Sequence, residues 1–306
     1  MRQASHIFRN PHPGIAVVLF AGTAGLTAVF NFFFAASEIN QVSRWLVPAC
    51  TGLAAWFINV VLVYRSGYLS RNYVLGWYWF VLLMATHPNG ISLGSVGTSV
   101  IVSVWLAMAY ELGDERKNGL IARTNLGLYS ASLGLFSLAW WSAVFPALWA
   151  LRNENPRQSA KIYGQIVAAW AIGVTIFFLI LGLTNQSIGS YFVPLNSFWG
   201  VNEWPSLGWW VIGIWLVLAL GETFRAQTSA KKAKRRGLML SWIGILWALS
   251  LYTWQGPESN AAAILVVFAA PHMVNLQSYM KKSWMIRLLD ISLLAAAFSS
   301  SFWGGQ

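Results

Sequence analysis

The sequence predicts an all-α fold, a polytopic transmembrane helical bundle that forms a single integral membrane domain over residues 1–306. Hydrophobic residues make up 57% of the chain and charged residues only 9%, whereas a soluble domain carries about 25% charged residues. The mean hydropathy is +0.55. Long apolar runs alternate with short polar connections, which is typical of a chain that crosses a membrane many times.

About eleven helical segments are expected. Nine of them are apolar runs between clusters of charge, and the remaining two come from the stretch 124–151. The nine runs are 13–36, 45–64, 72–86, 93–110, 162–184, 207–221, 237–254, 261–280 and 288–303. The first run follows a basic start, but its apolar part exceeds the roughly 7 to 15 residues of a signal-peptide core. We therefore expect it to be a retained helix.

The stretch 124–151 has no charged residue between Arg123 and Arg152. As one helix it would be about 42 Å long, against a hydrocarbon core of about 30 Å. Divided into two helices, each half is shorter than the roughly 20 residues of a full span. The length alone does not decide between one helix and two.

The distribution of basic residues favours two short helices in a hairpin. Short cytoplasmic loops of bacterial inner-membrane proteins are rich in Lys and Arg. With a cytoplasmic N-terminus and a hairpin at 124–151, 19 of the 20 Lys and Arg residues lie inside, and only Arg44 lies outside. With a single crossing, the run KKAKRR at 231–236 would lie outside.

This topology places the C-terminus in the periplasm and the sequence AWWS at the tip of the hairpin. Trp140 and Trp141 are then expected at the outer membrane interface, which tryptophan prefers. Pro146 falls within the first turns of the returning helix, where proline is tolerated best. The run at 231–236 is expected to be a cytoplasmic loop, with a second role as a contact for anionic lipid headgroups.

Three carboxylates are expected on the outer face: Glu38, Glu203 and Glu258. A site there that needs a general base or a metal-binding carboxylate must use these residues. Glu38 is the candidate catalytic residue, and Arg44, Glu203 and Glu258 are candidate substrate-binding residues. The alternative is that the three carboxylates are solvated loop residues without a role.

A second candidate site lies inside the membrane. His272 and Asp290 are about equally far from the turn MKKS, so they are expected at the same depth on neighbouring helices. Asn275 and Arg287 are expected one turn nearer the cytoplasmic surface. Ionisable groups at membrane depth are costly and mark a functional hypothesis. The pair predicts either a proton-coupled step or a structural clasp between two helices.

The sequence contains no phosphate loop, dinucleotide-binding turn, nucleophile elbow or His/Cys metal set. The single cysteine, Cys50, lies in an apolar run. No cofactor and no metal are therefore expected. Topology explains the net charge of +11 better than nucleic-acid binding does. The expected partners are membrane lipids and a membrane protein.

Several features resemble a family of uncharacterised polytopic inner-membrane proteins of Bacteroidota that has a domain-of-unknown-function label. They are the turn HPNG, the basic loop GDERKNGLIARTN and the run LGLYSASLGLFSLAWWSAVFPALWALR, in this order. The short-helix hairpin between basic ends also resembles the membrane core of GT-C type glycosyltransferases. That resemblance implies a polyprenyl-phosphate lipid as donor, with Glu38 as base or metal ligand. The acidic pair of those enzymes, with its neighbouring aromatic residue, is missing.

Three functions are consistent with these features. The scarcity of polar residues favours a non-enzymatic subunit or scaffold in cell-envelope assembly. The first alternative is a GT-C-like transferase at the periplasmic face that uses a polyprenyl-phosphate-linked donor. The second is a proton-coupled transporter or lipid carrier that uses His272, Asp290 and Arg287.

Overall fold

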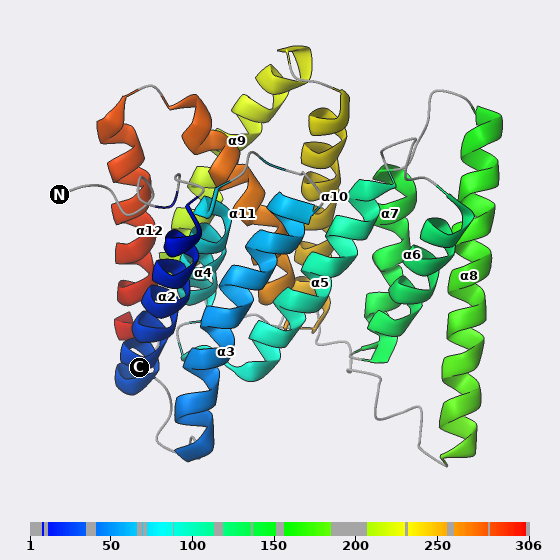
Figure 1. Ribbon diagram of the computed structural model, residues 1–306, viewed down its shortest axis with the longest axis horizontal. Helices are drawn as coiled ribbons and strands as arrows, with labels where there is room; N and C mark the ends of the chain where they lie inside the picture. Colours follow the sequence, from blue (N-terminus) through cyan, green and yellow to red (C-terminus); the bar gives the residue numbers. More distant parts are fainter. Residues whose placement is uncertain are drawn as a thin grey trace. The chain divides into compact units, whose positions relative to one another are not determined.

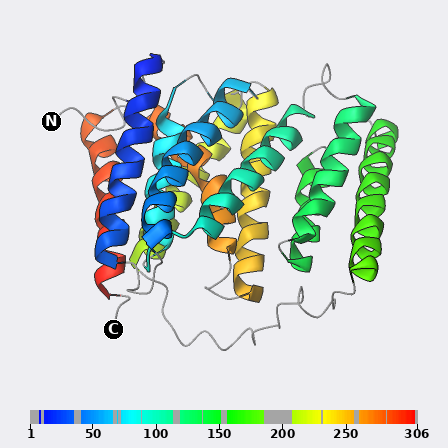
Figure 2. The ribbon, with the colours of Figure 1, turned by 60° about the horizontal axis from the view of Figure 1, so that its bottom comes forward.

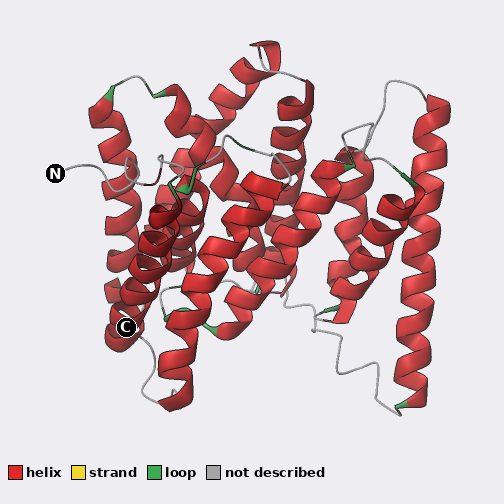
Figure 3. Cartoon of the chain, in the orientation of Figure 1, coloured by secondary structure: helices red, strands yellow, loops and turns green. Residues whose placement is uncertain are grey.

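The structure is a computed structural model, and it describes most of the chain. The described residues are 8, 12–34, 41–65, 69, 72–87, 89–112, 119–135, 137–150, 156–184, 207–229, 232–255, 260–280 and 282–303. Within these ranges the regular structure is helical throughout, without a strand (Figure 3). The predicted all-α fold class is confirmed.

The described part of the chain contains eleven α-helices (Figure 1). They are α2 (Pro13–Phe34), α3 (Gln41–Asn59), α4 (Val74–Thr86), α5 (Leu93–Glu111), α6 (Leu120–Ser132), α7 (Val144–Ala150), α8 (Pro156–Leu183), α9 (Leu207–Ser229), α10 (Lys232–Gln255), α11 (Ala261–Tyr279) and α12 (Ser283–Trp303). A short π-helix, η1 (Val60–Arg65), extends α3. The number of helices equals the number expected from the sequence.

Five of the described helices are long and apolar enough to cross a membrane. Their apolar segments are Pro13–Phe33, Trp45–Tyr64, Leu93–Glu111, Ala160–Leu183 and Ala261–Tyr279. Three further apolar segments are shorter: helix α4, the part Gly208–Glu222 of α9 and the part Gly237–Thr253 of α10. The chain therefore has the helices of a multi-pass membrane protein.

The chain divides into two compact units that are interleaved along the sequence. The first comprises Met1–Val104, Val201–Ala230 and Ala262–Gln306, and the second comprises Trp105–Gly200 and Lys231–Ala261. The single domain predicted from the sequence stays a prediction. Each unit is described by itself below.

In the first unit, α4 packs against α2, α3, α9 and α12. Every residue of α4 is buried, so this helix has no polar face and lies at the centre of its unit. The N–H of Tyr73, just before α4, donates to the carbonyl of Phe8 at 2.7 Å. Asn31, near the end of α2, bonds the backbone of Ile91, which follows α4. Helices α2 and α4 therefore run in the same direction.

Helix α12 runs in this direction as well. Asp290 in the first half of α12 bonds Tyr78, near the start of α4. Phe298, nearer the end of α12, makes an edge contact with Phe30, near the end of α2, with ring centroids 6.1 Å apart. The alternation of crossings predicted from the charges requires this shared direction of α2, α4 and α12.

The second unit contains the predicted hairpin. Helix α6 is followed by two 3₁₀ segments, η2 (Leu133–Leu135) and η3 (Leu138–Ala143), and then by α7. Helices α6 and α7 both pack against α8, and the three lie side by side in Figures 1 and 2. Pro146 is the third residue of α7, which agrees with the predicted position of this proline. The stretch 124–151 is thus two short helices.

The sequence AWWS, expected at the tip of the hairpin, lies in η3, within the connection between α6 and α7. One prediction needs correction. The basic run, expected to be a loop, enters α10 from Lys232, because Lys, Arg and Ala are good helix formers. Helix α10 therefore begins before the apolar run, which starts at Gly237.

The two hairpin tryptophans pack inside the second unit. Trp140 is only 2% exposed. Nε1 of Trp141 donates to the carbonyl of Ala131 at 2.8 Å, and its ring contacts Phe177 and Phe178 of α8 edge-on. Packing within the unit accounts for the burial of Trp140 and for the bonded indole N–H of Trp141. Their expected position at the outer membrane interface stays a prediction.

Candidate functional site

The outer-face candidates fall mostly outside the described part of the chain. Glu38, Glu203 and Glu258 are not among the described residues. Arg44 lies in the first turn of α3, and its side chain is not described. A catalytic or substrate-binding role for these four residues stays a prediction.

The best-defined candidate site is a buried polar contact in the first unit. The phenol of Tyr78 in α4 donates a hydrogen bond of 2.9 Å to Oδ1 of Asp290 in α12. Tyr78 is fully buried and Asp290 is 7% exposed. A buried carboxyl group is tolerated only when hydrogen bonds replace its hydration, and the phenol supplies one of these bonds. The contact can hold two helices together and can bind or release a proton.

The other predicted members of this site lie on the same two helices as expected. His272 and Asn275 in α11 are buried, with exposures of 0% and 2%. Arg287 lies one turn before Asp290 on α12 and is exposed. The predicted contact between His272 and Asp290 stays a prediction, whereas the observed contact to Asp290 comes from α4.

The sequence pattern does not single out Tyr78. Its helix is apolar on all sides, so no periodic pattern distinguishes the tyrosine from its neighbours. The available signal was chemical, because a buried tyrosine hydroxyl usually has a hydrogen-bond partner. The two residues are 212 positions apart, and counting outward from one turn relates only helices that are adjacent in the sequence.

A second hydrogen bond reaches α12 from a third helix. Nε1 of Trp215 in α9 donates to Oγ of Ser292 at 2.8 Å, two residues beyond Asp290. Helix α12 is therefore bonded to α4 and to α9 at nearly the same level. Both bonds join helices, which is the usual role of polar side chains at helix interfaces in membranes.

Asn31 and Asn59 fix the two ends of α4. The amide of Asn31 donates to the carbonyl of Ile91 at 3.0 Å and accepts from its N–H at 2.9 Å. The amide of Asn59 donates to the carbonyl of Asn72 at 2.7 Å and accepts from the N–H of Gly76 at 3.3 Å. These side chains thus satisfy backbone groups at the connections and at a helix start, where such groups lack partners.

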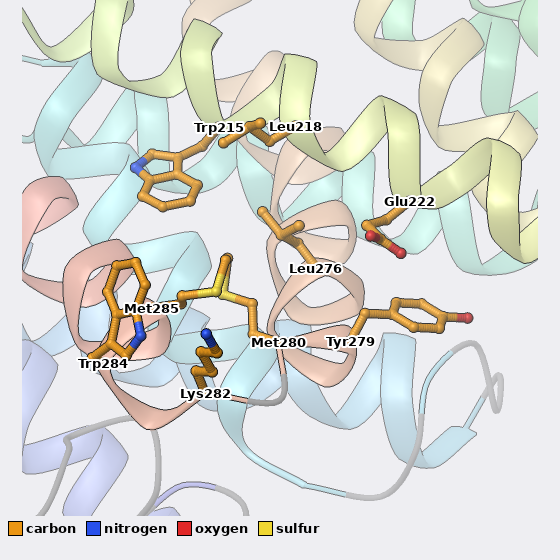
Figure 4. Close-up of a pocket in the computed structure, with 9 residues that line it drawn as sticks. All are labelled: Trp215, Leu218, Glu222, Leu276, Tyr279, Met280, Lys282, Trp284 and Met285. Atoms are coloured by element: carbon orange, nitrogen blue, oxygen red, sulfur yellow. The ribbon is translucent and has the colours of Figure 1, made fainter.

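The described residues include no group of three or more His, Cys, Asp or Glu side chains that could hold a metal ion. They do line an open groove of about 510 Å³ in the first unit, between α9, α11 and α12 (Figure 4). Its polar lining residues are Glu222 and Lys282, together with the phenol of Tyr279. The sequence does not reveal this groove, because its two charges are 60 positions apart and come together only in the folded chain.

Comparison with known proteins found no matching protein family, no matching curated protein and no matching solved structure. The resemblances to a Bacteroidota membrane-protein family and to GT-C glycosyltransferases therefore stay predictions. A function for this chain has to be proposed from the chemistry of its own residues.

Proposed function

We propose that this chain is a non-enzymatic subunit or scaffold of cell-envelope assembly in a bacterial inner membrane, with a cytoplasmic N-terminus and a periplasmic C-terminus. The observation that carries the proposal is the use of its buried polar side chains. Two hydrogen bonds between side chains join helices of the first unit. Tyr78 bonds Asp290, and Trp215 bonds Ser292. Groups that are engaged in holding helices together do not need a substrate to explain them.

The second unit supports the same function. Nε1 of Trp105 in α5 donates to Oγ of Ser130 in α6 at 2.9 Å. Nε1 of Trp247 in α10 donates to Oγ of Ser142 in η3 at 2.7 Å. Each indole N–H thus joins two elements of this unit. These two bonds stabilise the packing of the second unit, and a helical unit held together in this way is suited to hold partner subunits in a membrane.

The test is complementation of cells that lack the chain. A variant that carries Glu38→Gln and Arg44→Gln removes the base and the phosphate contact that a transferase would need. We expect this variant, at the wild-type membrane level, to restore envelope composition fully, and the tagged chain to retain a stable membrane-protein partner in mild detergent. Loss of envelope glycan with the variant would favour the GT-C-like transferase instead.

A proton-coupled lipid carrier is the second candidate, and the buried carboxyl group of Asp290 favours it. A carboxyl group at membrane depth with a hydroxyl partner can carry a proton between two states. Scrambling of a fluorescent phosphatidylethanolamine in proteoliposomes, read by dithionite bleaching at pH 5.5 and 7.5, tests this function. Scrambling that depends on pH and disappears with Asp290→Asn would support the carrier. Equal bleaching in liposomes with and without the protein would exclude this activity.

A further inference from the structure

The groove in the first unit has an apolar wall, formed by the middle of α9, the end of α11 and the start of α12. Its apolar lining includes Leu218 from α9, Leu276 and Met280 from the end of α11, and Met285 from the start of α12. Two aromatic rings, Trp215 and Trp284, complete this lining (Figure 4). The volume of about 510 Å³ is in the range of small-molecule sites, which are about 300 to 1,000 Å³.

Two opposite charges line the same groove. Glu222 comes from α9, and Lys282 comes from the turn between α11 and α12 (Figure 4). Oε2 of Glu222 is buried and has no hydrogen-bond partner among the described residues. A buried carboxylate oxygen without a donor is unfavourable, so a ligand with an N–H donor would relieve a cost that the folded chain carries.

Both charges lie where the apolar helix segments end. The apolar run 207–221 is followed directly by Glu222, and α11 ends at Tyr279, three residues before Lys282. Trp284 is 57% exposed beside them, and tryptophan prefers the level of the lipid headgroups. The groove thus combines charged, aromatic and apolar groups in the way that suits the level where a lipid headgroup meets its acyl chains.

We propose that this groove binds the headgroup of a phospholipid with a primary ammonium group, phosphatidylethanolamine. The ammonium group donates to Oε2 of Glu222, Lys282 contacts the phosphate, and the apolar wall contacts the start of the acyl chains. A trimethylammonium headgroup has no N–H to donate and leaves Oε2 unsatisfied. An anionic headgroup matches Lys282 but not Glu222. The site is independent of whether the chain acts as a scaffold or as a carrier.

Native mass spectrometry of the full chain tests the proposal. The detergent-solubilised protein is offered equal amounts of phosphatidylethanolamine, its N-methyl and N,N-dimethyl forms, phosphatidylcholine and phosphatidylglycerol, with the same acyl chains. We expect one phosphatidylethanolamine to be retained about tenfold more than phosphatidylcholine, because a charge-assisted hydrogen bond is lost with the last N–H. The dimethyl form keeps one N–H and should be retained nearly as well.

Matched variants assign the preference to the two charges. Glu222→Gln should abolish the preference for phosphatidylethanolamine over phosphatidylcholine, while Glu111→Gln, a carboxylate at the end of α5, should keep it. Lys282→Gln should weaken retention of both lipids, while Arg287→Gln, an exposed cation on α12 outside the groove lining, should not. Each variant is analysed only if it elutes as a single species in size-exclusion chromatography.

The wild-type lipid series tests the proposal even if a variant does not fold. Equal retention of phosphatidylethanolamine and phosphatidylcholine, or a preference for phosphatidylglycerol, would overturn it. So would a preference that survives in Glu222→Gln. Displacement of the lipid by soluble phosphoethanolamine at comparable concentrations would indicate a soluble ligand and would also overturn the lipid assignment.

Discussion

The phenol of Tyr78 donates a hydrogen bond of 2.9 Å to Oδ1 of Asp290, across 212 positions of sequence. This bond joins the fully buried helix α4 to α12 and gives a buried carboxyl group a donor. The same bond joins two helices of the first unit and contacts the carboxyl group that is the candidate proton-binding site. Stability and any proton-linked activity should therefore depend on the same contact.

Removal of the phenol is the direct test of this contact. Tyr78→Phe keeps the ring and leaves Asp290 with one donor fewer, so we expect a loss of about 1 to 2 kcal/mol in stability. Thermal unfolding in detergent, followed by intrinsic fluorescence, measures it. Tyr163→Phe in α8, a half-buried tyrosine of the second unit, is the matched control and should have a smaller effect. An unchanged melting temperature for Tyr78→Phe would show that the bond contributes nothing.

Asn31 should hold the connection after α4 through both of its amide bonds. Asn31→Asp keeps an acceptor for the N–H of Ile91 but loses the donor to its carbonyl, whereas Asn31→Ala loses both. Hydrogen exchange of the Ile91 amide should therefore be slow in the wild type, intermediate or slow in Asn31→Asp, and fastest in Asn31→Ala. If the two variants exchange alike, the side-chain acceptor does not protect this amide.

Gly127 should be required for the close approach of α6 and α8. A Cβ at Gly127 would meet the carbonyl oxygen of Ile166 and lie 2.8 Å from Cβ of Ala169, so Gly127→Ala should destabilise the second unit by about 1 to 3 kcal/mol. Gly164 lies in α8, and a Cβ there would meet nothing within 4 Å. Gly164→Ala should therefore be neutral or stabilising by up to about 1 kcal/mol. Equal effects in thermal unfolding would contradict the close packing.

The connection between α4 and α5 should loosen in acid because of His87. Burial lowers the pKa of His87 to about 4, although the carbonyl of Leu83, 3.0 Å from Nδ1, opposes the shift. When the connection is open and His87 is in water, its imidazole binds a proton near pH 6.5. When the connection is closed and His87 is buried, the imidazole binds a proton only near pH 4. The stability of the closed form is therefore complete above about pH 6.5 and falls as the pH is lowered towards 4.

Hydrogen exchange of the amides at 89–92 measures this effect after correction for the intrinsic pH dependence of exchange. Protection should decrease between pH 6.5 and 4.5 in the wild type. In His87→Gln, which has no titrating ring, protection should not change over this range. A wild type that shows no loss of protection would indicate that His87 is not protected from protonation.

Charge distribution predicted more of this fold than hydrophobic periodicity did. The positive-inside rule selected two helices for 124–151, and α6 and α7 confirm that choice. Periodicity could not place Tyr78, because α4 is buried on every side and has no polar face to mark its orientation. Periodicity also fails to orient α11, because 94% of its apolar stretch is buried and no polar face marks its direction.

The candidate site was predicted in part. The cost of a charge at membrane depth identified Asp290 from the sequence, and the structure buries it. Its observed partner and the groove at Glu222 depend on contacts between helices that are far apart in the sequence. No rule based on local spacing gives such contacts, so they required the three-dimensional packing.

The hairpin makes a prediction about membrane sidedness that can be tested with single cysteines. Cys50 is the only native cysteine, so Cys50→Ser gives a background without thiols. Gly119 precedes α6 and Ala160 lies in the first turns of α8, and both are exposed.

If the stretch 124–151 enters the membrane and returns to the same side, cysteines introduced at 119 and 160 should both react with a membrane-impermeant maleimide only from the cytoplasmic side. Thiols at Ser92 and Thr184, also exposed, should react from the opposite side in intact cells. Labelling of 119 and 160 from opposite sides would mean that the stretch crosses the membrane once, and it would reverse the orientation of every helix from α8 onward.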